Sequence, residues 1–242
     1  MKRDKNMWRS WFGGAIAGLA MLSLLLSSCL KKDGGPSAAP PTALMTVIQA
    51  SPDQPPLDFY LNGDKVNQLP LTFGSGIDYF SAIAGQRAAN FYNSGTFSPI
   101  VATAQVTLQQ NMAYSLFLDS VSAKPGILFL ADTLLKPAGE DAGVRFVDLS
   151  PDAPAVDLVI QGGPTIATNK SFKGYTSFIP VAGQSNFTFE ILKKGTSTVL
   201  ATLSNVTLIS GYLYTVMLEG LSNPTNSTDK LNVVMITNAY FN

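Results

Sequence analysis

The chain has 242 residues, 16 basic and 16 acidic side chains, no histidine and a single cysteine. These counts exclude an intramolecular disulfide, histidine-based nucleophilic catalysis, and zinc sites built from histidine and cysteine. Residues 1–28 hold four of the basic and one of the acidic residues, so the remainder carries a net charge of −3. A weakly acidic chain disfavours nucleic-acid binding, because that affinity comes mainly from basic residues that displace counterions.

Residues 1–28 are typical of an export signal. Four basic side chains occur among the first nine residues, and an apolar run follows at 12–26. This run of about 15 residues is shorter than the roughly 20 that a membrane-spanning helix needs. We therefore expect a secretory signal peptide, with an uncleaved membrane anchor as the alternative.

The apolar run ends in Leu26-Ser27-Ser28-Cys29, which resembles the lipobox that lipoprotein signal peptidase recognises. In proteins with this motif, the cysteine thiol is attached to diacylglycerol and the chain is cut just before the cysteine. The resemblance implies that Leu26, Ser27 and Ser28 are the recognition residues and that Cys29 is the lipidation site, which anchors the protein at a membrane. Leu30, rather than an aspartate, follows the cysteine, which favours the outer membrane. A periplasmic and a surface-facing orientation are both open.

The rest of the chain divides into a tether and two modules. Residues 29–43 are rich in Gly, Pro, Ala and Ser without apolar periodicity, which predicts a flexible tether behind the lipidated cysteine. We expect a first β-sandwich module at 44–135, a linker at 136–143 and a second module at 144–242. The linker is expected because Pro, two Gly and two acidic residues interrupt the apolar pattern there.

A repeated phrase is the basis for expecting two modules. The sequence SPDQPPLDFYLNG at 51–63 returns as SPDAPAVDLVIQG at 150–162, with a constant offset of 99 residues. A period of this length indicates a duplicated domain rather than a solenoid. Six residues recur at the same spacing: Ser51, Pro52, Asp53, Pro55, Asp58 and Gly63 in the first copy, and Ser150, Pro151, Asp152, Pro154, Asp157 and Gly162 in the second.

Apolar residues alternate with polar ones throughout both copies. This period of two predicts half-buried strands, with Phe59 and Leu158 facing the cores and Asp58 and Asp157 facing solvent or bonded within turns. The pattern predicts an all-β chain of two tandem, Ig-like β-sandwiches, and no amphipathic helix after residue 43. Seven segments of the first copy qualify as strands: 44–50, 56–61, 77–83, 87–93, 100–108, 112–119 and 126–132.

The phrase Ser-Pro-Asp-x-Pro-x-x-Asp, with a strand on either side, resembles the family called domain of unknown function 4397. The resemblance covers both copies, at 44–135 and 143–238, and it is stronger in the second copy. Members are typically exported bacterial proteins, often lipoproteins, with the unit present singly or in tandem. The family has no established activity, so the resemblance implies a location and a β-module but no catalytic residue.

The recurring aspartates are the main candidates for chemistry. Asp53 with Asp58, and Asp152 with Asp157 and nearby Asp148, offer oxygen ligands of the kind that calcium prefers. The alternating spacing of a calcium loop is missing, however. Ser-Pro-Asp also suits a tight turn, because proline presets φ and the aspartate bonds the local backbone. We therefore favour a turn motif with no metal.

These observations predict a cell-envelope lipoprotein that acts as a non-catalytic binding, adhesion or structural module. We expect no enzymatic activity and no cofactor, a membrane contact through the N-terminal lipid, no nucleic-acid partner, and a protein or glycan as the ligand. The alternative is an accessory glycan-binding lipoprotein of a polysaccharide uptake system. Tyr60, Tyr79, Tyr92 and Tyr175 are expected to be exposed, and two interpretations stay open for them: a contact patch, or tyrosines at the sandwich rim without a binding role.

Overall fold

A computed structural model describes residues 39–121 and 124–241 of the chain. These residues form 16 β-strands and one short 3-10 helix, η1 (Ser227–Asp229), which confirms the predicted all-β fold class. The predicted signal peptide, Cys29 and most of the tether lie outside the described residues. Within the described ranges, no helix has the length and apolar character needed to cross a membrane.

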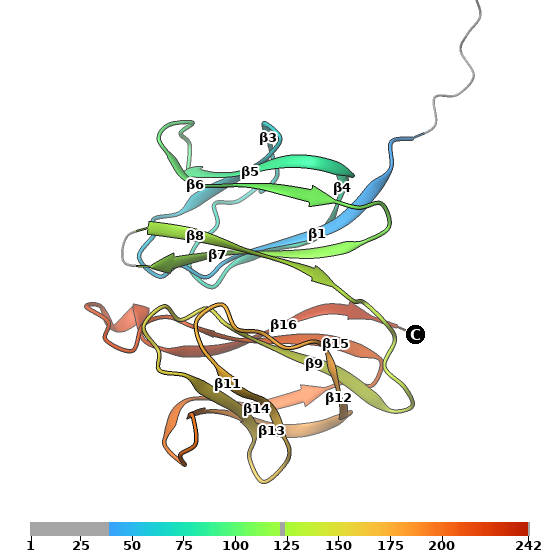
Figure 1. The fold of residues 1–242 in the computed structure, drawn as a ribbon, viewed down its shortest axis with the longest axis vertical. Coiled ribbons are helices and arrows are strands. Elements are labelled where there is room, and N and C mark those ends of the chain that lie inside the picture. Colours follow the sequence, from blue (N-terminus) through green and yellow to red (C-terminus); the bar gives the residue numbers. More distant parts are fainter. Residues whose placement is uncertain (1–38, 122–123, 242) are drawn as a thin grey trace, which may run out of the picture. The chain divides into compact units, whose positions relative to one another are not determined.

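The first half of the chain is a sandwich of two four-stranded sheets, with orders β4-β1-β7-β8 and β3-β2-β5-β6 (Figure 1). Strands β1 and β7 are parallel, and the other neighbours are antiparallel. The strands are β1 (Thr42–Gln49), β2 (Leu57–Leu61), β3 (Asp64–Lys65), β4 (Gly76–Ile83), β5 (Gly85–Asn93), β6 (Ile100–Leu108), β7 (Ala113–Val121) and β8 (Lys124–Asp132).

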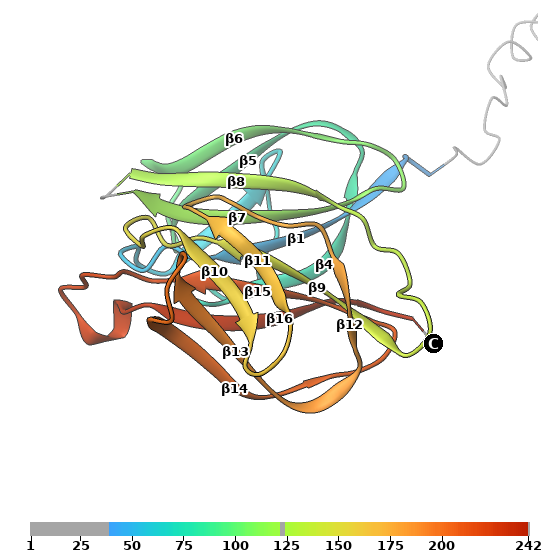
Figure 2. The ribbon, with the colours of Figure 1, turned by 60° about the horizontal axis from the view of Figure 1, so that its bottom comes forward.

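The second half repeats this topology strand by strand. Its sheets have the orders β12-β9-β15-β16 and β11-β10-β13-β14 (Figure 2), which are the first-half orders with eight added to each strand number. Strands β9 and β15 form the equivalent parallel pair. The strands are β9 (Asp141–Asp148), β10 (Val156–Ile160), β11 (Thr165–Lys170), β12 (Ile179–Ala182), β13 (Gln184–Lys193), β14 (Val199–Leu208), β15 (Tyr212–Glu219) and β16 (Asn232–Tyr240).

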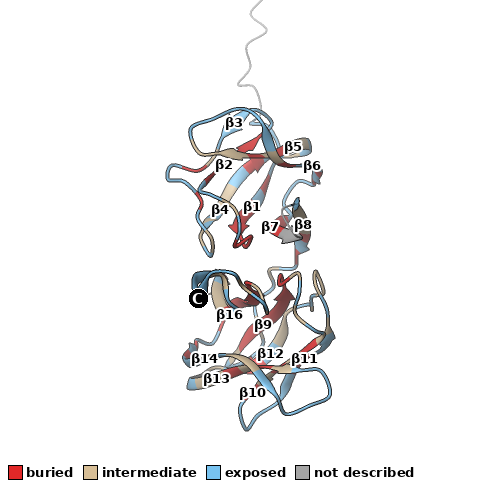
Figure 3. Cartoon of the chain, turned by 90° about the vertical axis from the view of Figure 1, so that its left-hand side faces the viewer, coloured by how far each residue is buried: buried red, intermediate tan, exposed pale blue. Residues whose placement is uncertain are grey.

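The alternating pattern produces a separate apolar core inside each sandwich (Figure 3). Phe59 and Leu158 are fully buried in these cores, as the pattern predicted. In the first core, the ring of Phe59 lies 5.0 Å from that of Phe91 on the neighbouring strand. In the second core, Leu158 is part of a buried cluster with Phe189. Burying an aromatic or Leu side chain contributes roughly 1.5–3 kcal/mol, so each of these residues stabilises its module by about that amount.

The strand limits depart from the sequence pattern in several places. Strands β1, β5 and β8 each begin two residues earlier than predicted, so β1 starts at Thr42, inside the predicted tether 29–43. Strand β3 was not predicted, because its two residues are too short to show periodicity. Strand β9 begins at Asp141, inside the predicted linker 136–143, because Asp141 already pairs with Ala182 of β12. The amide of Asp141 also bonds the carbonyl of Ala138 at 3.1 Å, which closes the turn that leads into the strand.

A third apolar cluster joins the two modules, which belong to one compact unit. It is built from the outer faces of sheets β4-β1-β7-β8 and β12-β9-β15-β16, because their residues alternate with those that face each module's own core. The two sheets are therefore covered on both faces. The buried members are Ile48, Ala50, Phe117 and Leu130 from the first module, and Val147, Leu149 and Met217 from the second.

Candidate functional site

The repeated Ser-Pro-Asp motifs form the turns that follow β1 and β9. In the first, the Ser51 hydroxyl donates to Asp53 Oδ1 at 2.9 Å, and the Ser51 amide donates to Gln49 Oε1 at 2.7 Å. In the second, the Ser150 amide donates to Asp148 Oδ1 at 3.0 Å, in the same arrangement. These local bonds organise a tight turn, which is the role that we favoured for the motif.

The aspartates of the second motif bond backbone amides rather than one another. Asp152 accepts bonds from the amides of Ser222 (2.7 Å) and Asn223 (3.1 Å), which tie this turn to the loop after β15. Asp157 accepts a bond of 2.7 Å from the amide of Asn169. Across residues 39–121 and 124–241, no group of three acidic side chains is arranged to hold a metal ion.

Asp58 does not face solvent but is bonded within turns, the second of the two arrangements that we expected. Its side chain is 1% exposed, because β3 and the β5–β6 loop cover the outer face of β2. The carboxylate pairs with Lys65 Nζ at 2.9 Å and accepts bonds from the Gly95 amide (2.8 Å) and Asn67 Nδ2 (3.2 Å). Burial alone would raise the pKa of Asp58, but the Gly95, Lys65 and Asn67 contacts outweigh it and lower the pKa.

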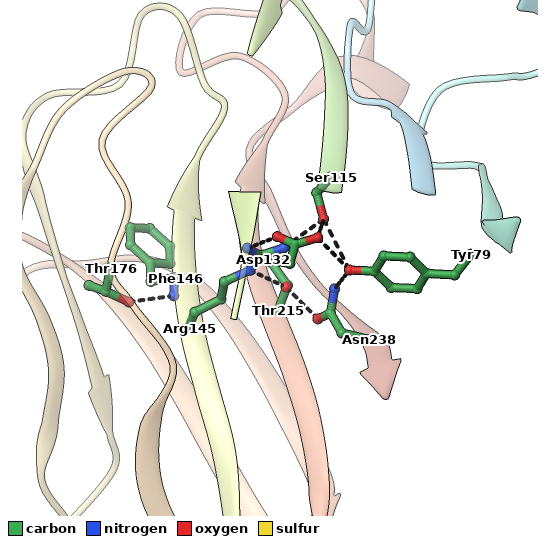
Figure 4. A network of polar contacts seen from close by, with 8 residues as sticks. All are labelled: Tyr79, Ser115, Asp132, Arg145, Phe146, Thr176, Thr215 and Asn238. Atoms are coloured by element: carbon green, nitrogen blue, oxygen red, sulfur yellow. Dashed lines mark hydrogen bonds and ion pairs between the residues drawn. The ribbon is translucent and has the colours of Figure 1, made fainter. Parts of the chain in front are cut away.

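A buried polar network lies where the two modules meet (Figure 4), and the sequence pattern did not identify it. Arg145 on β9 is 3% exposed, and its Nη1 pairs with Asp132 Oδ1 at 2.5 Å. Its other nitrogens donate to the hydroxyls of Ser115 (2.8 Å) and Thr215 (2.7 Å). The guanidinium also lies 4.7 Å from the ring centre of Phe178. One side chain of the second module thus bonds two strands of the first.

Tyr79 completes this network from β4. Its hydroxyl donates to Asp132 Oδ2 at 2.5 Å and accepts a bond from Asn238 Nδ2 at 3.2 Å. Burial and the Asp132 charge raise the pKa of Tyr79, so it remains a protonated donor. The expectation that Tyr79 is exposed is therefore wrong, because the outward face of β4 lies against the other module.

Three further acids lie at the strand ends beside the interface. Asp119 of β7 is fully buried and pairs with Lys173 of the second module at 3.0 Å. Asp148 is fully buried, and its Oδ2 has no hydrogen-bond partner among the described residues. Glu219 of β15 is 2% exposed. Burial raises the pKa values of Asp148 and Glu219 to about 7.

An aromatic cluster marks the outer sheet of the first module. Tyr60, Tyr92 and Phe97 pack with ring centres 5.3 to 6.3 Å apart, and Phe97 is 72% exposed. Tyr60 and Tyr92 are thus brought together, but Tyr60 is only 7% exposed, so the expectation of an exposed side chain is wrong for Tyr60. Tyr175 is 50% exposed in the loop between β11 and β12 of the second module.

Comparison with known proteins gives one family match. The family model named Domain of unknown function (DUF4397) matches residues 43–159. This match covers the first module and continues through β9 and the second Ser-Pro-Asp turn into β10. The resemblance inferred from the motif is confirmed over this range, whereas for the second copy, where the motif resemblance is stronger, it stays a prediction. None of the curated proteins matches the sequence.

Two solved structures are distantly similar to the chain. One is CBMbc (family CBM26) from Eubacterium rectale Amy13K in complex with maltoheptaose, with 10% identity, 82% of this chain and 97% of that chain covered, and a TM-score of 0.26. The other is a candidate cell adhesion protein from Parabacteroides distasonis, with 11% identity, coverages of 82% and 99%, and a TM-score of 0.25. TM-scores this low carry no argument about function.

Proposed function

We propose that the protein is a non-catalytic lipoprotein of the cell envelope, anchored through Cys29 to the outer membrane. Its two modules act there as a binding, adhesion or structural unit. The observation that carries this proposal is the buried junction between the modules, where the Arg145–Asp132 ion pair and an apolar cluster fix one sandwich to the other. A tethered pair of firmly docked sandwiches suits the presentation of a surface rather than the closure of an active site.

The second module is, on this proposal, another copy of the DUF4397 unit. The identical strand order of the two halves supports it, as does the 99-residue offset of the Ser-Pro-Asp motif. The two motifs also use equivalent hydrogen bonds, with the Ser51 amide on Gln49 and the Ser150 amide on Asp148. A duplicated unit accounts for both the repeated phrase and the repeated topology.

Replacing Cys29 with Ser tests the anchoring. We expect the wild-type protein to begin at a lipid-modified Cys29. The Cys29→Ser protein should carry no lipid and should escape cleavage before residue 29, because the cysteine thiol is the group that accepts the lipid. Folding of the modules should be unchanged, because Cys29 precedes the first strand by 13 positions. Intact-mass spectrometry of the mature amino terminus gives the answer.

The matched control for this experiment is Ser28→Ala, which keeps a small residue before the cysteine and should be processed normally. An unmodified Cys29 in the wild-type protein, or cleavage well downstream of it, would contradict both the lipoprotein assignment and the proposed location.

Glycan binding by an accessory lipoprotein of a polysaccharide uptake system is the second candidate. The exposed ring of Phe97, supported by Tyr60 and Tyr92, favours it. On the same sheet, the Thr103 hydroxyl donates to Asn90 Oδ1 at 2.7 Å at an exposed position. Sites for small ligands combine aromatic side chains with a few placed polar groups in this way.

Affinity electrophoresis through polysaccharide gels tests the second candidate. We expect Phe97→Ala to weaken retardation by roughly tenfold, since an aromatic contact contributes about 0.5–1.5 kcal/mol beyond its buried area. Tyr175→Ala is the control, because it removes an exposed ring from the other module. Glycan binding is rejected if no polysaccharide retards the wild-type protein, or if both substitutions weaken retardation equally.

A further inference from the structure

The connection between the modules runs between two apolar grooves. One groove, of about 320 Å³, is lined by Leu44, Met112 and Leu135 among others. The second groove, of about 390 Å³, is lined by Leu135, Pro137 and Leu213 among others. The two grooves share Thr133 and Leu135, so they form one continuous surface, which we call the linker groove.

The linker groove exposes large apolar side chains to water. Leu135 is 69% exposed, Leu44 is 44% exposed and Met112 is 39% exposed. Ile83, which pairs with Thr42 where β1 begins, is 50% exposed at the same end of the sheet. A contiguous exposed apolar surface of this kind marks a site of interaction with another molecule or with a membrane.

The position of this surface in the chain indicates what covers it. Strand β1 begins at Thr42, and Leu44 of the groove follows two residues later. The 13 residues that join Cys29 to Thr42 span at most about 45 Å when fully extended. The linker groove borders the start of β1, where the tether ends, so a lipid on Cys29 keeps this groove within reach of the bilayer.

We propose that the linker groove docks the folded modules onto the phospholipid bilayer in which Cys29 is anchored, an inference that rests on the proposed function. Leu44, Met112 and Leu135 enter the boundary between headgroups and acyl chains. The chain after residue 28 has a net charge of −3, so the attraction comes from apolar burial and not from a basic surface. We therefore expect docking to occur on zwitterionic lipid and to be insensitive to salt.

The test uses the lipidated protein in phosphatidylcholine vesicles, with and without brominated acyl chains. Both tryptophans of the sequence, Trp8 and Trp11, precede Cys29, so an introduced tryptophan is the sole indole of the mature chain. The reporter is Leu135→Trp, and the control is Phe97→Trp, at 72% exposure against 69% for Leu135. Phe97 lies in the loop after β5. Strand β5 begins next to the end of β4 that lies beside the linker groove, and it runs away from the groove.

We expect brominated lipid to remove roughly half of the Leu135→Trp emission, as for a side chain at the headgroup boundary, and to leave Phe97→Trp emission unchanged. The difference should persist in about 0.5 M NaCl, where exposed charges are screened within a few ångströms. Met112→Trp provides a second reporter on the other wall of the groove and should be quenched likewise.

The remaining outcomes separate the two proposals. If the protein fails to float with the vesicles, the lipid anchor is absent and both proposals are overturned. If it floats but neither groove reporter is quenched, the anchor stands and the docking is overturned. A concentration-dependent blue shift of Leu135→Trp without quenching would identify a second copy of the chain as the occupant, and would also overturn membrane docking.

Discussion

Replacing Arg145 with Met is expected to lower the free energy of unfolding by about 3–5 kcal/mol, the usual result of removing one partner of a buried ion pair. The substitution leaves the Asp132 carboxylate buried without its cation, with bonds only from Tyr79 and Ser115. It also removes the bond from Arg145 to Thr215. Urea unfolding followed by far-ultraviolet circular dichroism measures the change.

Two variants make this prediction specific. Arg145→Met combined with Asp132→Asn should recover about 2 kcal/mol or more, because the double variant no longer buries an unpaired charge. Arg87→Met is the control, since Arg87 bonds only the carbonyls of Ile83 and Ala84 at the sheet end, and should cost under about 1 kcal/mol. An Arg145→Met protein as stable as the wild type would show that the network does not hold the modules together.

The strands themselves could be predicted from the sequence, because burial on one face of a sheet imposes a period of two. The pattern placed Phe59 and Leu158 correctly, since each lies on the face that packs inside its own sandwich. The period says which face a residue is on, but not what covers the other face. Tyr79 was misplaced for this reason, because the second module covers it. The two arrangements expected for Asp58 could not be separated either, because a neighbouring loop decides between them.

The junction between the modules could not be predicted from periodicity. Arg145 in the second copy is equivalent to Thr46 in the first copy, which lies 99 residues earlier in the chain. A charged residue in the middle of an otherwise apolar strand is a signal that a partner is buried with it. The partner, Asp132, lies on another sheet, and only the three-dimensional packing brings the two together.

The same comparison of copies explains the pH dependence that we expect. Asp148 takes the position of Gln49, and both side chains accept a bond from the serine amide two residues later. Gln49 is neutral at every pH, whereas Asp148 is an acid in a fully buried position. Burial raises the pKa of Asp148 from 3.8 to about 7. The second module therefore has an ionisable group at a site where the first module has an amide.

Replacing Asp148 with Asn is expected to stabilise the protein by roughly 2–4 kcal/mol at about pH 8 and by little at about pH 4, at about 1.4 kcal/mol per pKa unit. Well below pH 4 both folded and unfolded states keep the proton. As the pH rises toward 7, the unfolded state loses it first, so wild-type stability falls, and the penalty is complete above 7. The asparagine oxygen can still accept the Ser150 amide.

Urea unfolding of both proteins at about pH 4, 6 and 8 tests this, with the stability difference widening as the pH rises. Glu219 also has a raised pKa, so some slope should remain in the variant. Asp78→Asn, at an exposed position of β4, is the control and should leave the pH profile unchanged. If Asp148→Asn shifts stability equally at every pH, Asp148 is ionised in the folded protein, and burial does not control its titration.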